Sequence, residues 1–564
     1  MSQTIYVRCE AVNLGASVYD TEDLSTIRGA GLAILNLSDR LRDICTGLGG
    51  TDPKEITSGA SQAVIRVTLP DDRDELERFR TDVEEELRRG SQLQFATVLV
   101  AVSSADFGVA REELVASIRA RQMRSARLSH AGITATVTSR EESGTAMRSW
   151  CAIDMVRPAK VTPQKIRNDE KRFLSTSVDA RRRHGFEAKQ AFYKKLDGVQ
   201  WDPQIDGGYE FAWDFHQIAA FDKATREAAK DGEFSSNLNG KLAVIYIDGN
   251  SFGAKQRLHC TDEKSQQNYD TIVQGNWRKA IRRILNAAWS PDRGLDPRWW
   301  NAVESEAPRL RLETLLWGGD EVIWVVPAWQ GLAVLNTFFH TILDRTGHSA
   351  TGNGPFGEFT YSAGLVFCHA EAPIRGIVEL ARELTEFCKD AVNDNKAGPD
   401  GVNRFAYAVL ESFDQLGDDY HEARNRHLPF SPGTLGDAAV KAAVSNDPSA
   451  FADNWPAFVA MRDQFPHGSV YQILRELRQP VPPTPEGGEA TFVPRAVRAI
   501  DRGLRDAPAL ANDPAVQRLF LPGSDGKLGD ERRMNWLMLA ELWDYFGPGP
   551  YVDSGRPVGE GSAS

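Results

Sequence analysis

The stretch ETLLWGGDEVIWVVPAW, residues 313–329, joins two apolar runs through a Gly-Gly pair that is followed by two acids. Apolar runs of this kind, rich in β-branched and aromatic residues, are typical of buried strands, so the stretch predicts a hairpin that presents Asp320 and Glu321. A second apolar run, LAVIYID at 242–248, continues into Asp248-Gly249-Asn250. Strand ends can place carboxylates close together, and glycines leave room for a phosphate chain. The two segments therefore predict the two halves of one metal site that serves nucleotide chemistry.

Nucleotidyl transfer explains why acids would be needed at two strand ends. The reaction activates a hydroxyl beside an α-phosphate and lets pyrophosphate leave, and two divalent metals about 4 Å apart do both when carboxylates hold them. Neighbouring strands lie roughly 4.8 Å apart, so Asp248 on one strand could share a metal pair with Asp320 and Glu321 on a neighbouring hairpin. Gly249 would let backbone amides approach the triphosphate, and Asn250 could orient a ribose or a phosphate.

Each segment also has a purely structural interpretation. Asn, Gly and Asp are favoured in turns whatever the function, so IDGN at 247–250 can be a strand-to-loop turn and GGDE at 318–321 a hairpin turn. Both segments follow a buried strand, in the order that one α+β unit requires. We therefore favour the functional interpretation.

Length and composition indicate a soluble protein of several domains. At 564 residues, the chain suggests about three or four domains. The net charge of −12 indicates no general role in nucleic-acid binding, although it is compatible with a local basic patch. The six cysteines are far apart and include no CxxC pair, which indicates reduced, mostly buried thiols. Because the sequence shows no signal-peptide pattern and no apolar run of roughly 18 residues, it predicts a cytoplasmic protein.

The periodicity along the chain predicts an α+β protein with two ferredoxin-like or polymerase-palm domains, the second one catalytic, and a helical C-terminal domain. Strand and helix patterns at 5–12, 24–45, 63–69, 71–89 and 95–102 give the order β-α-β-α-β, followed by a helix at 110–127. From 240 onward the order is β-α-β-β-α-β with one further helix. The predicted parts are a first palm-like, non-catalytic domain at 1–155, a basic polar connector at 156–238, the catalytic palm at 239–411, the helical domain at 412–546 and a disordered tail at 547–564.

The connector contains many Lys and Arg residues between 156 and 186. A run of charge is usually a solvated face, and we give this interpretation first. The same stretch is also the place where a partner protein or a guide RNA could dock on an otherwise acidic chain.

Several segments resemble the palm domain of the CRISPR polymerase, the large subunit of type III CRISPR effector complexes, and more distantly the GGDEF diguanylate cyclases. They are IYIDGNSFG (245–253), ETLLWGGDEVIWVVPAW (313–329), TYSAGLVFCHAEAPIRGIVELARELTEFCK (360–389) and GVNRFAYAVLESFD (401–414). The family uses D-G-D and then G-G-D-D. This chain has Asn250 where the family has the second acid of the first motif, and Glu321 gives the second motif the GGDEF form.

The resemblance extends to the N-terminal half, where DTEDLSTIRGAGLAILNL (20–37) resembles the first palm and LSTSVDARRRHGF (174–186) the connector. The connector of the family often binds zinc through cysteines, but only Cys151 stands there in this chain, so we expect no zinc. No His-Asp dyad lies near residue 1, so DNA cleavage by the HD nuclease domain of the family is not expected.

The resemblance implies that ATP is joined into cyclic oligoadenylate, a second messenger of antiviral defence. It implies that Asp248, Asp320 and Glu321 hold Mg²⁺ or Mn²⁺ and that Gly318 and Gly319 make space for the nucleotide. The nucleotide-binding set then also includes Gly249, Asn250, Ser251, Lys389 and Lys396, with Ser251 near the base or ribose, Lys389 as a phosphate-binding lysine, and Asn403 after them.

Three alternatives stay open at the level of sequence. The two lysines also suit a helix C-terminus, where cations are favoured anyway. The whole chain could be a catalytically eroded palm that binds nucleotide as a scaffold subunit of an RNA-guided complex, with Asn250 as the mark of erosion. Gly-Gly-Asp-Glu alone would also fit a diguanylate-cyclase-like enzyme. The segment Ser362-Ala363-Gly364 is expected to pack the sheet and not to touch the substrate.

Overall fold

The structure is a computed structural model of the 564-residue chain. It describes residues 2–12, 14–59, 61–70, 73–89, 91–93, 96–124, 150–159, 164–167, 170–195, 210–290, 294–301, 307–343, 356, 358–394, 402–411, 428–429, 445–478, 494–547 and 549–552. The chain forms two compact units. The first unit comprises Met1–Trp201, Phe252–Arg278 and Thr314–Ile323, and the second comprises Asp202–Ser251, Lys279–Glu313 and Trp324–Ser564.

The first unit is built on a four-stranded antiparallel sheet. Its elements are β1 (Ser2–Val12), α1 (Leu14–Ser17), α2 (Leu24–Leu35), α3 (Leu37–Gly47), β2 (Thr51–Ser58), β3 (Gln62–Pro70), α4 (Arg73–Arg88), η1 (Ser91–Leu93), β4 (Thr97–Ser103) and α5 (Phe107–Arg124). The strand order is β2-β3-β1-β4. With helices between β1 and β2 and between β3 and β4, this is the ferredoxin-like arrangement of an α+β fold.

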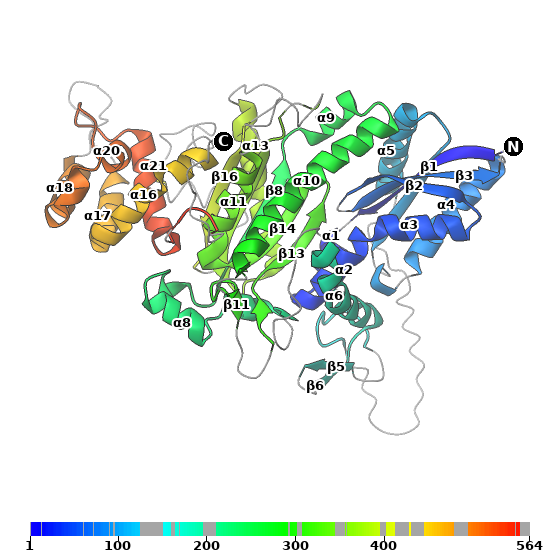
Figure 1. Cartoon of the computed structure of the whole chain (residues 1–564), viewed down its shortest axis with the longest axis horizontal. Helices are drawn as coiled ribbons and strands as arrows, with labels where there is room; N and C mark the ends of the chain where they lie inside the picture. Colours follow the sequence, from blue (N-terminus) through cyan, green and yellow to red (C-terminus); the bar gives the residue numbers. More distant parts are fainter. Residues whose placement is uncertain are drawn as a thin grey trace, which may run out of the picture. The chain divides into compact units, whose positions relative to one another are not determined.

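The sheet of the first unit separates two layers of helix. Tyr6 of β1 and Leu99 of β4 belong to one core cluster with Phe107 of α5. Because side chains alternate along a strand, Cys9 points to the opposite face, where it lies near Cys45 of α3. Figure 1 shows α5 on one side of this sheet and α3 and α4 on the other. The sheet is therefore buried on both faces.

Two elements of the first unit differ from the sequence prediction. The helix predicted over 24–45 is two helices that meet at Asn36, whose backbone amide caps the end of α2. The prediction also lacks β2, because TDPKEITS is mostly exposed and carries charges and a proline in place of an apolar alternation. Charge and proline are common on edge strands, where they prevent further pairing. The order β-α-β-α-β is therefore corrected to β-α-β-β-α-β.

Helices α2 and α6 (Thr176–Lys195) of the first unit cross at glycines. A Cβ atom on Gly29 would lie 1.7 Å from the carbonyl oxygen of Arg181, and one on Gly185 would lie 2.3 Å from that of Ser25. Both distances are far shorter than a van der Waals contact, so only glycine fits at either position. The crossing packs the segment at 174–186 directly against the start of the chain.

The basic stretch at 156–186 is only partly a surface feature. Arg181 is buried, and its guanidinium binds the carboxylate of Asp20 at 2.8 and 3.0 Å. Arg157 pairs with the same carboxylate at 2.7 Å. Lys171, by contrast, is exposed. The expectation that the stretch as a whole is a solvated face or a docking surface is therefore wrong for the two arginines, which anchor the connector inside the unit.

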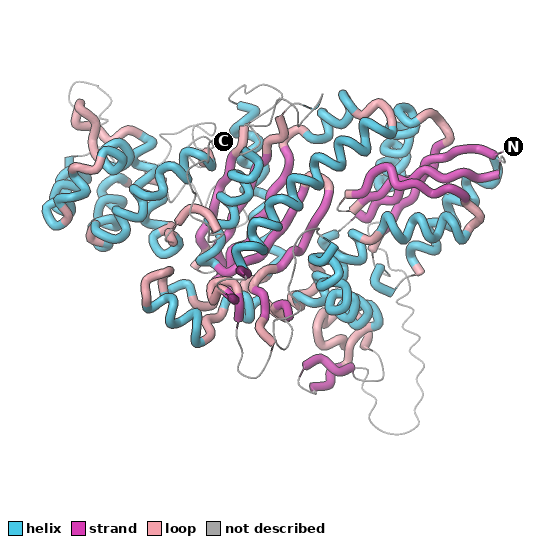
Figure 2. The backbone as a smooth tube through the Cα atoms, viewed as in Figure 1, coloured by secondary structure: helices cyan, strands magenta, loops and turns pink. Residues whose placement is uncertain are grey.

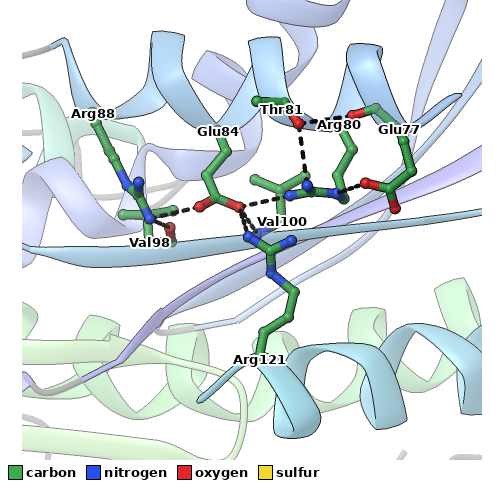
Figure 3. A network of polar contacts seen from close by, with 8 residues as sticks. All are labelled: Glu77, Arg80, Thr81, Glu84, Arg88, Val98, Val100 and Arg121. Carbon is green, nitrogen blue, oxygen red and sulfur yellow. Dashed lines mark hydrogen bonds and ion pairs between the residues drawn. The ribbon is translucent and has the colours of Figure 1, made fainter. Parts of the chain in front are cut away.

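A buried carboxylate surrounded by three arginines ties together three elements of the first unit (Figure 3). The side chain of Glu84 in α4 is 8% exposed, and it pairs with Arg80 at 3.1 Å and with Arg88 at 2.6 Å. It also pairs with Arg121 of α5 and accepts the backbone amide of Val100 in β4 at 3.3 Å. Since β4 is the edge strand, Arg121 can reach around it. One carboxylate therefore joins both helical layers to the sheet.

We expect the substitution Glu84→Gln to lower the free energy of unfolding by about 2–3 kcal/mol, because it removes the buried negative charge that three arginines share. Urea denaturation followed by circular dichroism measures the change. Glu77→Gln is the matched control, since the Glu77 side chain is 76% exposed and pairs only with Arg80 among the contacts in Figure 3. The control should cost less than about 1 kcal/mol. Equal losses of unfolding free energy in the two variants would contradict the stabilising role of Glu84.

The second unit contains most of the other large sheet. Its principal elements are β7 (Glu210–Phe211), α7 (Phe215–Ala219), α8 (Lys223–Lys230), η2 (Ser236–Leu238), β8 (Lys241–Gly249), β11 (Trp300–Asn301), β12 (Arg309–Leu310), η3 (Ala328–Gln330), α11 (Gly331–Leu343), β15 (Tyr361–His369), α13 (Ile374–Asp394) and β16 (Arg404–Val409). β15 pairs antiparallel with β8 and parallel with β16. The sequence predicts strands at 242–248, 359–367 and 404–409 and helices at 331–345 and 374–392, and β8, β15, β16, α11 and α13 agree with these ranges to within a few residues.

Three elements run through the boundary between the units. They are α10 (Glu263–Ala288), β13 (Glu313–Gly318) and β14 (Glu321–Pro327). The strand order β13-β14-β8-β15-β16 repeats, for its first four strands, the order of the sheet in the first unit. The helix α9 (Phe252–His259), which follows the first predicted motif, is absent from the sequence prediction.

The C-terminal part of the second unit is helical, as the sequence predicts, and Figure 2 shows helices and loops there without strands. The helices are α16 (Pro448–Gln464), α17 (His467–Leu477), α18 (Pro494–Asp506), α19 (Pro508–Ala511), α20 (Pro514–Phe520), α21 (Asp530–Glu541) and η7 (Trp543–Tyr545). The helix predicted at 437–444 and the loop predicted at 480–488 lie outside the described residues.

The beginning of the predicted tail is placed against α11. Asn336 Nδ2 donates to the carbonyl oxygen of Pro550 at 3.0 Å, and the amide of Val552 donates to Thr337 Oγ1 at 2.9 Å. Residues 553–564 lie outside the described part. None of the described helices combines the length and the apolar character that crossing a membrane requires.

Candidate functional site

The Gly-Gly-Asp-Glu segment forms a tight turn between β13 and β14 in the first unit. Gly318 has a φ of 135° and Gly319 a φ of 58°, which residues with a Cβ rarely adopt. A positive φ at the first central position is the pattern of type II′ hairpin turns. The indole N–H of Trp277 in α10 donates to the carbonyl oxygen of Gly319 at 3.0 Å. Asp320 and Glu321 stay partly exposed, so the turn is held in place while its acids remain accessible.

A cavity of about 280 Å³ lies beside this turn within the first unit. Its wall includes Gly319 and Asp320 of the turn and Gly253 of α9. The rings of Phe252 and Tyr269 supply an apolar side, with an edge-to-face contact at 6.2 Å between centroids. Small-molecule sites measure about 300–1,000 Å³, so the cavity lies near the lower end of that range, a size that suits a base and its sugar.

Three arginines line the cavity, and two of them are paired with carboxylates: Arg8 with Glu10 at 2.9 Å and Arg111 with Glu112 at 2.8 Å. The third is Arg257. Arg111 donates to the carbonyl oxygen of Gln256 at 3.0 Å and also to that of Cys260, so its charge sits at the C-terminus of α9, where cations are favoured. Guanidinium groups bind phosphate oxygens well. The cavity therefore combines an acid that suits a metal with cations that suit phosphates.

A buried carboxyl group of unusual pKa also lines the cavity. Burial raises the pKa of Asp270 to about 7, the charge of Glu55 adds to this, and hydrogen bonds from Thr57 and Gln266 act in the opposite direction. Within the described part of the chain, Asp270 Oδ2 and Gln266 Oε1 have no hydrogen-bond partner. A perturbed carboxyl group in a cleft is a common mark of a functional site.

We expect the stability of the protein to fall between about pH 4 and pH 7, because the folded state retains the proton of Asp270 over this range while the unfolded state releases it. The substitution Asp270→Asn removes this loss, so the variant should be more stable than the wild type at pH 8 by at least about 1 kcal/mol. Denaturation at pH 4 and pH 8 measures both proteins. A variant whose gain is the same at both pH values would contradict the assignment.

In the second unit, the first predicted ligand lies at the end of a buried strand. Asp248 of β8 faces Ser362 of β15 in the register and is 7% exposed. Lys389 of α13 forms an ion pair with Asp248 Oδ2, and the same ammonium binds Glu386 at 2.9 Å. Burial lowers the pKa of Lys389, but the carboxylates of Asp248 and Glu386 outweigh this and raise the pKa above its usual value. The predicted phosphate-binding lysine is therefore bound to the predicted metal ligand.

Asn250 is occupied by the sheet itself. Its Oδ1 accepts the hydroxyl of Ser362 at 2.8 Å, and its Nδ2 donates to the carbonyl oxygen of Val402 at 3.2 Å and to Thr360 Oγ1 at 3.3 Å. The side chain is 6% exposed. These contacts use both ends of the amide, and a carboxylate could not make the two donations. Ser362 is fully buried and serves this tie, in agreement with the expectation that it packs the sheet.

The other predicted site residues of the second unit surround this tie. Gly249 is the last residue of β8 and is buried, and Ser251 has a φ of 59°, which turns the chain sharply after the strand. Asn403 Oδ1 accepts the backbone amide of Tyr361 at 2.8 Å, a structural role. Lys396 lies outside the described residues.

The predicted metal ligands are divided between the two units. Asp320 and Glu321 belong to the first and Asp248 to the second. Over the described ranges, no group of three His, Cys, Asp or Glu side chains is arranged to hold a metal ion. The carboxylates are hard oxygen donors of the kind that Mg²⁺ and Mn²⁺ prefer, so the donor set fits such an ion by its chemistry. The site of three carboxylates stays a prediction.

The sequence analysis did not identify the residues that enclose the cavity. Arg8 and Arg111 come from the first sheet and from α5, and Asp270 comes from the middle of α10. Glu263, at the start of α10, accepts the hydroxyl of Tyr6 at 2.8 Å and pairs with Arg66 at 3.0 Å. No local pattern marks these residues, because their roles depend on contacts over some 200 residues of chain.

We expect the substitution Asn250→Asp to destabilise the protein by about 1–3 kcal/mol, because it places a carboxylate against the carbonyl oxygen of Val402 and removes both donations. Thermal or urea denaturation measures this. Asn454→Asp is the matched control, since Asn454 only accepts from Arg518, at 2.6 Å, and an aspartate can also accept. An Asn250→Asp variant that is as stable as the control and binds Mn²⁺ more tightly would show that position 250 is a vacant ligand position.

Comparison with known proteins identifies the fold. No model of a protein family matches the sequence, and no curated protein matches it. Among solved structures, Csm1 of T. onnurineus has a TM-score of 0.53 at 12% identity, over 96% of this chain and 69% of that one. The Csm1–Csm4 cassette in complex with one ATP has a TM-score of 0.50 at 11% identity, over 96% and 70%. The Csm1–Csm4 subcomplex of the type III-A CRISPR-Csm interference complex has 0.50 at 13%, over 96% and 70%.

These neighbours confirm the resemblance that the motifs predict. The chain has the fold of Csm1, the large subunit of type III CRISPR effector complexes. At identities of 11–13% the likeness establishes the fold and leaves the chemistry to be argued from this chain's own residues.

Proposed function

We propose that this chain, with the fold of a type III CRISPR large subunit, is a metal-dependent nucleotidyltransferase. It joins ATP through attack of a 3′-hydroxyl on an α-phosphate, and its product is a cyclic oligoadenylate that acts as a second messenger in antiviral defence. The likeness in fold supports the choice of ATP, since a Csm1–Csm4 cassette of that fold has been solved in complex with one ATP.

The cavity beside the Gly-Gly-Asp-Glu turn is the observation that supports the proposal most. It brings the acid Asp320 and the glycines Gly253 and Gly319 to one wall, near Arg8 and Arg257. An acid for a cation, guanidinium groups for phosphates and aromatic rings for a base are the components that a nucleoside triphosphate requires. The volume of about 280 Å³ suits the nucleoside part.

The proposed roles follow the predicted site. Asp248, Asp320 and Glu321 hold Mg²⁺ or Mn²⁺, which activates the attacking hydroxyl and neutralises the leaving pyrophosphate when bound. Gly318 and Gly319 keep the turn free of side chains beside the nucleotide. Gly249, Ser251 and Lys389 complete the proposed nucleotide site, with Lys389 for the phosphates.

We also propose that the protein assembles with other subunits of an RNA-guided complex. A Csm1–Csm4 subcomplex is among the structures of the same fold. The exposed part of the basic stretch, such as Lys171, is then the surface for RNA, because the buried Arg181 is occupied by Asp20. Copurification from native cells, followed by RNA extraction, tests this.

A nucleotide-binding scaffold without catalysis is the second candidate function. It is favoured by Asn250, which the sheet uses as a tie where the family has an acid. A scaffold would bind ATP with metal dependence and form no product. The third candidate, a diguanylate-cyclase-like enzyme, would use GTP in place of ATP.

We expect the purified protein to convert ATP with Mn²⁺ into cyclic oligoadenylate, detected by mass spectrometry, and GTP to give no comparable product. The substitution Asp320→Ala should lower the rate by about 100-fold or more, because a lost metal ligand costs several kcal/mol of transition-state stabilisation. Asp463→Ala is the control, since Asp463 is 52% exposed and pairs with Arg462 in α16.

The outcomes separate the three candidates. Product from ATP that disappears in Asp320→Ala supports the proposal. Binding of ATP without product, in both proteins, leaves the scaffold function. A cyclic dinucleotide from GTP would identify the diguanylate-cyclase-like enzyme.

A further inference from the structure

The ion pair between Lys389 and Asp248 joins two groups to which the proposed function gives different ligands. Asp248 is a proposed metal ligand, and Lys389 is a proposed phosphate-binding residue. In the structure their side chains form an ion pair with each other. Neither group can serve its ligand fully until the pair is broken.

The surroundings hold this pair in place. The Asp248 side chain is 10% exposed and that of Lys389 is 22% exposed, so water screens the pair only weakly. Glu386, one turn earlier in α13, binds the same ammonium at 2.9 Å. Thr385, on the same turn, donates to the carbonyl oxygen of Tyr246 at 3.4 Å, so this part of α13 is attached to β8.

Asn250, two residues after Asp248, cannot take over the role of that carboxylate. The amide of Asn250 is bound to Ser362, Thr360 and Val402. A divalent ion that approaches the end of β8 therefore meets, in Asp248, a carboxylate that already has an ammonium partner. The ion and the ammonium compete for the same oxygen atoms.

We propose that Lys389 is a resident counter-ion of Asp248 that a divalent metal displaces, and that the displaced ammonium becomes available to the nucleotide phosphates. The inference rests on the proposed function. It adds that metal and nucleotide bind with positive coupling through this lysine, because the metal frees the group that the phosphates use. By linkage, bound nucleotide raises the affinity for metal by the same factor.

Binding of Mn²⁺ in the absence of nucleotide tests whether a divalent metal displaces Lys389 from Asp248. Electron paramagnetic resonance measures the free Mn²⁺. Lys389→Met removes the competing charge, so it should bind Mn²⁺ about tenfold more tightly than the wild type. Lys389→Arg keeps the charge and should bind like the wild type. Lys241→Met is the matched control: Lys241 lies at the other end of β8, pairs with Glu411 at 2.8 Å, and should have no effect.

A double variant identifies the carboxylate. The gain from Lys389→Met should disappear when Asp248→Asn is also present, since the lysine then has no ligand oxygen to release. A gain that persists in the double variant would show that the added Mn²⁺ affinity arises elsewhere and would overturn the inference. An unchanged or weaker Mn²⁺ affinity in Lys389→Met, with thermal unfolding at a lower temperature, would mark the pair as a structural tie and overturn it too.

The coupling is measured with a fluorescent, non-hydrolysable ATP analogue, with and without Mn²⁺. The ratio of the two affinities should fall several-fold in Lys389→Met and stay near the wild-type value in Lys389→Arg. Equal ratios in all three proteins would overturn the claim that metal and nucleotide binding are coupled through Lys389. These readouts do not require catalysis, so a protein that makes no product but shows the expected Mn²⁺ series would refute the proposed enzyme and retain the counter-ion role.

Discussion

A carboxylate at the end of a fully buried strand must be compensated, and Lys389 compensates Asp248. The strand that carries Asp248 is buried along nearly its whole length, so the charge cannot be left to water. The position of α13 over the sheet, the tie of Thr385 to Tyr246 and the accompanying Glu386 all bring the ammonium to that one oxygen. Asn250, two residues later, is a neutral amide, and a carboxylate there could not make its donations to Thr360 and Val402.

The two large sheets solve the same packing problem with different chemistry. Both have the strand order in which the first strand lies between the third and the fourth. In the first unit the buried carboxylate of Glu84 is shared among three arginines. In the second unit the buried carboxylate of Asp248 pairs with the ammonium of Lys389 at a strand end, and such a pair can be exchanged. A network of three arginines has no such freedom, because every partner that leaves exposes another charge.

Most of the core strands of the second unit could be predicted from the sequence, but the edge strand β2 and the residues that line the cavity could not. The apolar runs that become β8, β14, β15 and β16 have unbroken hydrophobic patterns, and these strands were predictable. β2 was not, because an exposed edge strand has no core-facing alternation to detect. The turn acids were predictable from Gly-Gly-Asp-Glu, since the φ values of Gly318 and Gly319 require glycine. The cavity residues Arg8 and Asp270 were not, because only the folded chain brings them to that wall.

Helix α10 is fastened at two places in the first unit. At its start, Glu263 holds Tyr6 and Arg66 of the first sheet, and some fourteen residues later Trp277 holds the carbonyl oxygen of Gly319. A helix is stiff over that length, about 21 Å at 1.5 Å per residue. Helix α10 therefore connects the first sheet, which does not contain the predicted metal ligands, to the turn that carries Asp320 and Glu321. A partner protein that binds to this sheet and displaces it would therefore also displace Asp320, although it would not contact the Gly-Gly-Asp-Glu turn.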